Sequence, residues 1–124
     1  MLTLKLPWPP SVNTYWRHIV IKGQARVLLS VDGRKYQANS YAAVREQIGM
    51  PVALTGRLRV SILVHPPDRR QRDLDNMSKA ILDGLAHAGV YANDAQIDHL
   101  ELIRGSLAQP KGGVEVTITE TEAP

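Results

Sequence analysis

The chain has 124 residues and a formal net charge of +3, and a chain of this length is expected to form one domain over residues 1–124. It contains no cysteine, which excludes disulfide bonds and thiolate zinc sites. The sequence has neither an apolar run of about 18 residues nor a charged leader followed by an apolar stretch. We therefore expect a cytoplasmic protein with no membrane partner.

The charges are unevenly distributed along the chain. Residues 1–72 hold 12 Lys and Arg against 3 Asp and Glu, whereas residues 73–124 hold 3 against 9. This change of sign favours a polyanion-binding surface beside an acidic site. The alternative is a folded surface that interleaves the two halves and removes the asymmetry.

The first elements predicted along the chain are strands. Residues 2–6 alternate as a strand does, and the proline-rich segment 7–10 stops them. Apolar-rich runs at 17–21 and 25–29 flank Lys22-Gly23-Gln24, which predicts a hairpin. The amino-terminal part of the chain is therefore expected to supply three strands.

A helix is predicted next. Ser30 or Asp32 can cap it, and Gly49 follows its expected end near Ile48. The positions near helical spacing, and therefore its expected inner face, are Tyr36, Tyr41 or Ser40, Val44 and Ile48.

The second half of the chain predicts strand, helix and two further strands. Residues 57–65 alternate strictly, a second helix is expected from about Leu74 to Ala88 with Gly89 as its cap, and strands are expected at 97–105 and 114–120. The apolar face of this helix is Leu74, Met77, Ile81, Leu85 and Ala88. The order βββαβαββ predicts an α+β fold, with a mixed β-sheet and two principal helices packed against it.

Three arginines directly precede a pair of aspartates in the segment that connects the central strand to the second helix. Arg69, Arg70 and Arg72 have the planar fork that suits phosphate oxygens, and Asp73 and Asp75 suit a hard cation such as Mg²⁺. This combination favours a metal-dependent nuclease. The alternative is structural, because either aspartate can cap free N–H groups in the first turn of the helix.

Further charged residues can complete this site. Lys79 is four residues after Asp75 and shares its predicted helix face. It can form an ordinary ion pair with Asp75, or it can act as a cation that stabilises developing negative charge. Asp94 lies in a turn after the helix and is a candidate third carboxylate, with Asp98 as its competitor. Asp83 continues the helix face and is interpreted as a solvated residue.

The segment 11–18 mixes amides, aromatics and bases, and it predicts a nucleic-acid contact loop. Trp16 or Tyr15 can stack on an unpaired base, and Arg17 can contact phosphate. Packing of Trp16 in the core is the alternative. We assign Lys111 to the same DNA-binding surface.

These motifs, in this order, resemble the RusA family of Holliday-junction resolvases. The segments that carry the resemblance are 6–13 (LPWPPSVN), 67–76 (PDRRQRDLDN), 94–96 (DAQ), 111–113 (KGG) and 116–120 (VTITE). The central segment is the most specific of them. The resemblance implies a homodimeric endonuclease of recombination and repair, which binds four-way DNA junctions and, with Mg²⁺, nicks two opposing strands symmetrically.

The resemblance also implies roles for individual residues. Asp73, Asp75 and Asp94 resemble the family's metal-binding acids, and Lys79 resembles its essential lysine. The chain departs from the family pattern at Asn93, where an aspartate is frequent.

A second departure concerns the aromatic residues that often follow the helix in this family. Here Val90-Tyr91 stands in their place, and the chain has no phenylalanine. Tyr91 is therefore the leading candidate for a side chain that opens the junction. The rival function is a non-catalytic branched-DNA-binding protein of prophage origin, which the intact set of three aspartates and a lysine argues against.

Overall fold

The computed structural model describes residues 1–105 and 110–121. Its strands are β1 (Leu2–Leu6), β2 (Trp16–Ile21), β3 (Gln24–Leu29), β4 (Arg57–His65), β5 (Ile97–Arg104) and β6 (Gly113–Thr121). Its helices are α1 (Val12–Tyr15), α2 (Val31–Ile48) and α3 (Ser78–His87), with short 3-10 turns η1 (Leu74–Asn76) and η2 (Asp94–Gln96). No helix in these ranges is both long enough and apolar enough to cross a membrane.

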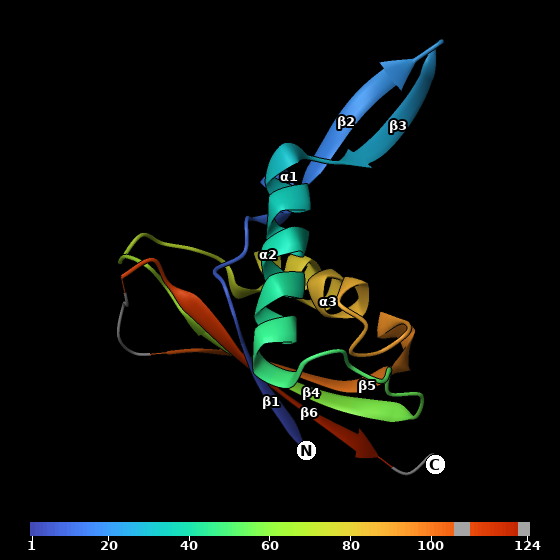
Figure 1. Ribbon diagram of the computed structural model, residues 1–124. Coiled ribbons are helices and arrows are strands. Elements are labelled where there is room, and N and C mark those ends of the chain that lie inside the picture. The colour runs from blue at the N-terminus through green and yellow to red at the C-terminus, as the bar shows by residue number, and fades with distance from the viewer. Residues whose placement is uncertain (106–109, 122–124) are drawn as a thin grey trace.

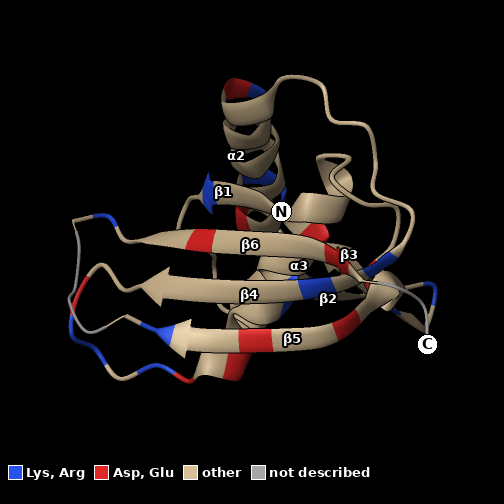
Figure 2. Cartoon of the chain, turned by 90° about the horizontal axis from the view of Figure 1, so that it is seen from below, with Lys and Arg blue, Asp and Glu red and all other residues tan. Residues whose placement is uncertain are grey.

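Four strands form one mixed sheet in the order β1-β6-β4-β5. β4 and β5 are parallel, and the other pairs are antiparallel. Figures 1 and 2 show α2 and α3 on the same face of this sheet, with the opposite face uncovered. The predicted α+β fold with a mixed sheet and two principal helices is confirmed.

The core forms between the sheet and these two helices. Leu58, Val60, Ile62 and Val64 are completely buried, because alternate residues of a strand point to the same face of the sheet. Leu85 of α3 is also completely buried in this cluster. The alternation that predicted β4 therefore identified the face that the helices cover.

Of the two predicted caps of α2, Ser30 is the one that the structure uses. The Ser30 hydroxyl accepts a hydrogen bond from the backbone N–H of Gly33 at 2.9 Å. Of the two candidates for its inner face, Ser40 is buried, whereas Tyr41 is 38% exposed. The prediction of Ile48 as a core residue was wrong, because the helix ends there and no further turn covers its side chain.

The second predicted helix starts later than expected. Leu74–Asn76 form a 3-10 turn, Met77 is the cap residue between this turn and α3, and α3 begins after it. Asp and Asn favour turns over helix interiors because their side chains compete for backbone hydrogen bonds. The prediction that Asp75 and Lys79 share one α-helix face was therefore wrong. Gly89 has φ 88°, as its predicted role in ending the helix requires.

The strands β2 and β3 form a separate two-stranded hairpin that projects from the rest of the molecule (Figure 1). Lys22 and Gly23 connect them, with φ values of 51° and 77°. Two consecutive positive φ angles are typical of the type I′ turn, which matches the twist of the flanking strands. The predicted hairpin is confirmed, whereas the short helix α1 before it was not predicted.

A β-bulge interrupts the pairing of β4 with β5. Leu58 pairs with Ile97 and Arg59 pairs with His99, so Asp98 is the extra residue between them. The Arg57 side chain donates to the Asp98 carboxylate from Nε at 2.9 Å. The bulge therefore places Asp98 in an ion pair at the edge of the sheet.

Candidate active site

The loop between β4 and η1 is organised around Asp68. Its carboxylate accepts a hydrogen bond from Arg72 Nη1 at 2.8 Å and another from the backbone N–H of Arg70 at 2.9 Å. These bonds, that of Arg72 first, lower the pKa of Asp68 to about 2. The Arg72 guanidinium also lies over the Trp8 ring, 5.5 Å from its centroid. Asp68 therefore ties the start of the loop to Arg70 and Arg72 further along it.

The three predicted phosphate-binding arginines have different surroundings. Arg69 is exposed and the Arg70 side chain is 82% exposed, whereas that of Arg72 is only 23% exposed. Arg104, at the end of β5, donates to the backbone carbonyl of Arg72. Figure 2 shows this basic loop beyond the ends of β4 and β5. Arg70 Nε lies 3.6 Å from Asp68 Oδ2, but most of the Arg70 side chain is exposed. Arg69 and Arg70 can thus both reach a ligand, and Arg72 has a structural role as well.

Asp73 and Asp75 line one shallow pocket together with Arg72 and Arg104. Asp73 is extended, with φ −86° and ψ 132°, and its side chain makes no capping hydrogen bond. Within the described ranges, neither carboxylate has a hydrogen bond or ion pair to another side chain or to the backbone. The helix-capping alternative is therefore wrong for Asp73, and both carboxylates are available to a ligand.

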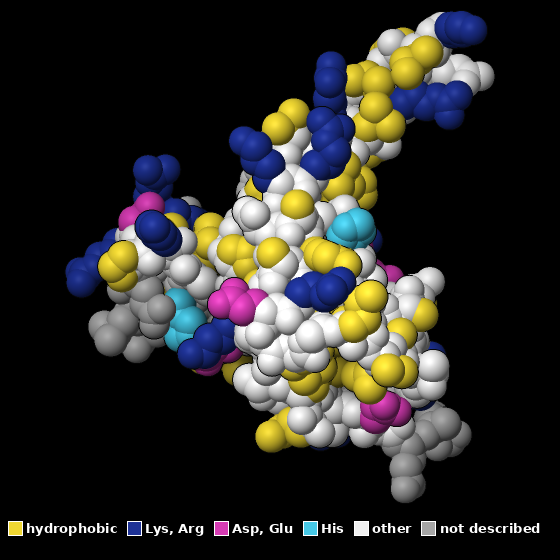
Figure 3. Space-filling view, viewed as in Figure 1, with side chains coloured by type: hydrophobic (Ala, Val, Ile, Leu, Met, Phe, Trp, Pro, Cys, Tyr) yellow, Lys and Arg dark blue, Asp and Glu magenta, His cyan; other side chains and the backbone are white. Residues whose placement is uncertain are grey.

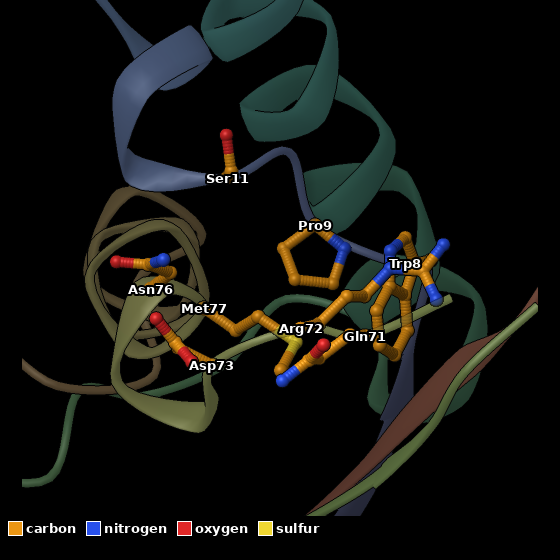
Figure 4. A pocket seen from close by; sticks show the side chains of 8 residues that line it. All are labelled: Trp8, Pro9, Ser11, Gln71, Arg72, Asp73, Asn76 and Met77. Atoms are coloured by element: carbon orange, nitrogen blue, oxygen red, sulfur yellow. The ribbon is translucent and has the colours of Figure 1, made fainter. Parts of the chain in front are cut away.

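A second pocket shares Asp73 with the first. Its walls come from the proline-rich segment after β1 and from the loop and turn that precede α3: Trp8, Pro9, Ser11, Gln71, Arg72, Asp73, Asn76 and Met77. Figure 4 shows the Arg72 side chain beside the Trp8 ring, with Asp73 and Asn76 at the other end of the pocket. The Asp73 carboxylate is thus reachable from the surface that the basic loop borders.

Lys79 lies between two carboxylates. Its Nζ is 3.2 Å from Asp83 Oδ1 and 3.6 Å from Asp94 Oδ2. Partial burial opposes the charged form of Lys79, but the hydrogen bonds and charges of Asp83 and Asp94 outweigh it and raise the lysine pKa. Lys79 is therefore a cation held between Asp83 and Asp94.

Asp83 is held from its other side by Tyr15. The tyrosine hydroxyl donates to Asp83 Oδ2 at 3.3 Å and accepts a hydrogen bond from Gln37 Nε2 at 3.0 Å. Burial, followed by the charge of Asp83, raises the pKa of Tyr15 to about 12, although the Gln37 hydrogen bond opposes this. Tyr15 therefore stays a neutral donor, and a hydrogen-bonded chain runs from α2 to Lys79. The interpretation of Asp83 as a solvated residue was wrong.

The turn η2 positions Asp94. The Asn93 side chain accepts a hydrogen bond from the backbone N–H of Ala95 at 2.8 Å, and Gln96 Oε1 accepts one from the Asn93 N–H at 2.9 Å. Asn93 thus serves as a cap where the family pattern often has an aspartate. Asp98, the competitor of Asp94, is paired with Arg57 instead, and that pairing lowers the Asp98 pKa.

The donor set suits a hard divalent cation, since it consists of carboxylate oxygens. Among the residues that the structure describes, no three His, Asp or Glu side chains are already grouped as a metal site. Asp73 and Asp75 provide two free carboxylates in one pocket. Asp94 contacts Lys79 instead, so it can join them on one ion only by exchanging that contact.

Two aromatic predictions were wrong. Tyr91 is 1% exposed and donates to the backbone carbonyl of Leu82 at 2.7 Å, so it does not project towards DNA. Tyr15 is completely buried and cannot stack on a base. Trp16 is half-buried, with its ring 5.0 Å from that of Tyr15 in an edge-to-face arrangement. It therefore packs against the core on one side and remains partly exposed to solvent.

Sequence reasoning missed three members of the site: Asp83, Tyr15 and Gln37. A signal for Asp83 existed, because it is four residues after Lys79 and four is the helical spacing of an ion pair. Nothing in the sequence indicated that Tyr15 contacts Asp83, which is 68 residues away.

Comparison with known proteins places this geometry in context. A family model described as "Endodeoxyribonuclease RusA" matches residues 7–119. The protein of Enterobacteria phage HK97 named "Crossover junction endodeoxyribonuclease rusA" is 39% identical over 118 residues, which cover 95% of this chain and 93% of the relative. Proteins of Shigella sonnei and Escherichia coli K12 named "Crossover junction endodeoxyribonuclease RusA" are each 37% identical over 119 residues, with the same coverage.

Proposed function

Since this chain belongs to the RusA family of endodeoxyribonucleases, we propose that it resolves four-way (Holliday) DNA junctions by paired symmetric nicks that depend on Mg²⁺. The observation that carries this proposal is the pair of free carboxylates, Asp73 and Asp75, in a pocket bordered by a basic loop. Metal-binding carboxylates beside phosphate-binding arginines are the groups that metal-dependent phosphodiester hydrolysis requires.

We assign the metal ligands to Asp73, Asp75 and Asp94. When bound, Mg²⁺ lowers the pKa of a water molecule and polarises the scissile phosphate. Lys79 supplies a fixed positive charge where negative charge develops on the phosphoryl oxygens. Its contact with Asp83 would keep the ammonium in place if Asp94 served as a metal ligand.

We assign phosphate binding to Arg69 and Arg70 first, because both are exposed. The other candidates are Arg72, Arg17, Trp16 and Lys111. The affinity for DNA is expected to fall steeply with salt, since each phosphate contact releases counterions. Preference for a junction is expected to arise from its shape and deformability.

Symmetric nicking of two opposing strands requires two identical sites, so we propose a homodimer with two-fold symmetry. Each subunit would then place one set of Asp73, Asp75, Asp94 and Lys79 on one of the two cut strands. A molar mass of about 27 kDa in light scattering, twice the 13.7 kDa of the chain, is the expected result. A monomeric mass that persists with bound junction would contradict the dimer.

The proposal is tested with a synthetic four-way junction and a linear duplex of the same sequence. Cleavage of the junction alone, and only with Mg²⁺, is expected; chelator should abolish cleavage and leave binding. Asp75→Asn should remove cleavage and keep binding, because it replaces a metal ligand with a neutral isostere. Asp98→Asn is the matched control, since Asp98 pairs with Arg57 instead.

Other outcomes distinguish the alternatives. Equal cutting of the duplex would reduce the assignment to a general nuclease. Binding of the junction without cleavage under any metal condition would favour the non-catalytic branched-DNA-binding protein. Full cleavage by Asp75→Asn would refute the assigned metal ligand.

A further inference from the structure

The β2–β3 hairpin is a feature that the nuclease site does not explain. It extends away from the sheet and helices (Figure 1), and all twelve residues of its two strands are exposed or half-buried. Among them, Val20 is 72% exposed and Val27 is 56% exposed. A hairpin with so little packing contributes little to the core, so its extension needs another explanation.

The two faces of the hairpin differ in chemistry. Arg17 pairs with Leu28 and Arg26 pairs with Ile19, and alternation puts both arginines on one face. The opposite face carries the Val20–Ala25 and His18–Val27 pairs, so it is mostly apolar. Lys22 stands at the tip. The arginine-bearing face also carries the apolar Ile19, Ile21 and Leu28. The positive charge of the ribbon is therefore confined to this one face and to the tip.

The positive charge of the hairpin is not neutralised by neighbours. The chain has no Asp or Glu before Asp32, and within the described part of the molecule none of Arg17, Lys22 and Arg26 has a carboxylate partner. Figure 3 shows Lys and Arg side chains along the projecting hairpin and no acidic side chain on the face in view. Charge complementarity therefore favours a polyanion as the partner of this arm.

We propose that the β2–β3 hairpin is a DNA-binding arm that lies in the major groove of one junction arm, with Arg17, Lys22 and Arg26 on its phosphates. This inference rests on the proposed function. A two-stranded ribbon fits the major groove, which is about 12 Å wide. Strands of six residues span about 20 Å, which corresponds to about six base pairs at about 3.4 Å each.

The root of the arm is fixed to the catalytic cluster. Tyr15, the residue before β2, donates to Asp83, the partner of Lys79. At the end of β3, the backbone N–H of Ser30 donates to the Tyr15 carbonyl at 3.0 Å. A side chain at Gly33 would come within 2.5 Å of the same carbonyl, so α2 packs tightly against the root. DNA held by the arm is therefore aligned with Lys79.

The test compares Arg17→Gln/Arg26→Gln with Lys5→Gln/Arg59→Gln, which removes the same charge from the main sheet. Affinity for a four-way junction is measured in chelator across a range of salt concentrations. The arm variant should bind more weakly, with a plot of log affinity against log salt shallower by about 2, since each phosphate contact contributes about 0.9 to the slope. Lys22→Gln should reduce the slope by about 1.

Footprinting supplies a second readout. The arm variant should lose protection over about six base pairs on one side of the branch point, and the control variant should keep it. Unchanged slope and protection in the arm variant would overturn the inference, as would equal losses in both double variants. A changed molar mass with an unchanged slope would instead make the hairpin a subunit contact and also overturn it. Because both measurements report binding and need no cleavage, they can refute the DNA-binding arm without refuting the proposed nuclease activity.

Discussion

Replacing Asp83 by asparagine tests whether the hydrogen-bonded chain from Tyr15 orients Lys79. The amide still accepts the Tyr15 hydroxyl but removes the negative charge that lies 3.2 Å from Lys79 Nζ. The lysine then keeps only its weaker contact with Asp94 at 3.6 Å. We expect kcat for junction cleavage to fall, while the dissociation constant for the junction in chelator stays unchanged.

The size of the effect follows from the geometry. A misplacement of about 1 Å at a reacting centre costs up to about 100-fold in rate, so we expect kcat to fall about 10- to 100-fold, or about 1.4–2.8 kcal/mol. The free energy of unfolding should change by less than about 1 kcal/mol, because a part-exposed helical ion pair contributes only about 0.3–0.5 kcal/mol. The loss of activity should thus exceed the loss of stability.

The control is Asp83→Glu, which keeps the charge and should recover most of the rate. Steady-state cleavage at saturating junction gives kcat, and urea unfolding gives the stability. Wild-type kcat in Asp83→Asn would refute the positioning role of Asp83. A loss of rate matched by an equal loss of stability would reduce Asp83 to a structural residue.

Two further predictions concern the fold and the basic loop. Leu85→Ala should destabilise the protein by about 2–5 kcal/mol in urea unfolding, because Leu85 is completely buried; Val52→Ala, at a side chain 90% exposed, should change it by less than about 0.5 kcal/mol. The lowered pKa of Asp68 means that its contribution to stability is complete above about pH 4 and is lost as pH falls towards 2. Carboxyl NMR titration should give a midpoint near 2, and Arg72→Gln should raise it.

Much of the fold was predictable because local patterns and tertiary packing agree. The alternation over 57–65 gave both the bounds of β4 and its buried face. Ser30 was a correct cap, and Gly89 ended the second helix as expected. Each of these depends on neighbours a few residues away, which a sequence displays directly.

The errors have tertiary causes. Tyr91 was expected to contact the junction because it stands where the family often has aromatic residues, but its hydroxyl donates to the carbonyl of Leu82 in the core. Asp83 was expected to be solvated because the face opposite the apolar stripe usually is, but Tyr15 covers it. The start of α3 was placed too early because an apolar Leu74 continued the helical spacing through a 3-10 turn. The roles of the predicted metal ligands stay predictions.

The bulge at Asp98 has a consequence for insertions and deletions. It adds one residue to β5 without adding a pair to the ladder with β4. Deleting Asp98 would draw η2 along the strand by one position, about 3.3 Å, which is close to the 3.6 Å between Lys79 Nζ and Asp94 Oδ2. A substitution at this exposed position leaves that separation intact, whereas a deletion does not. The length of this edge strand is thus more constrained than the identity of its residues.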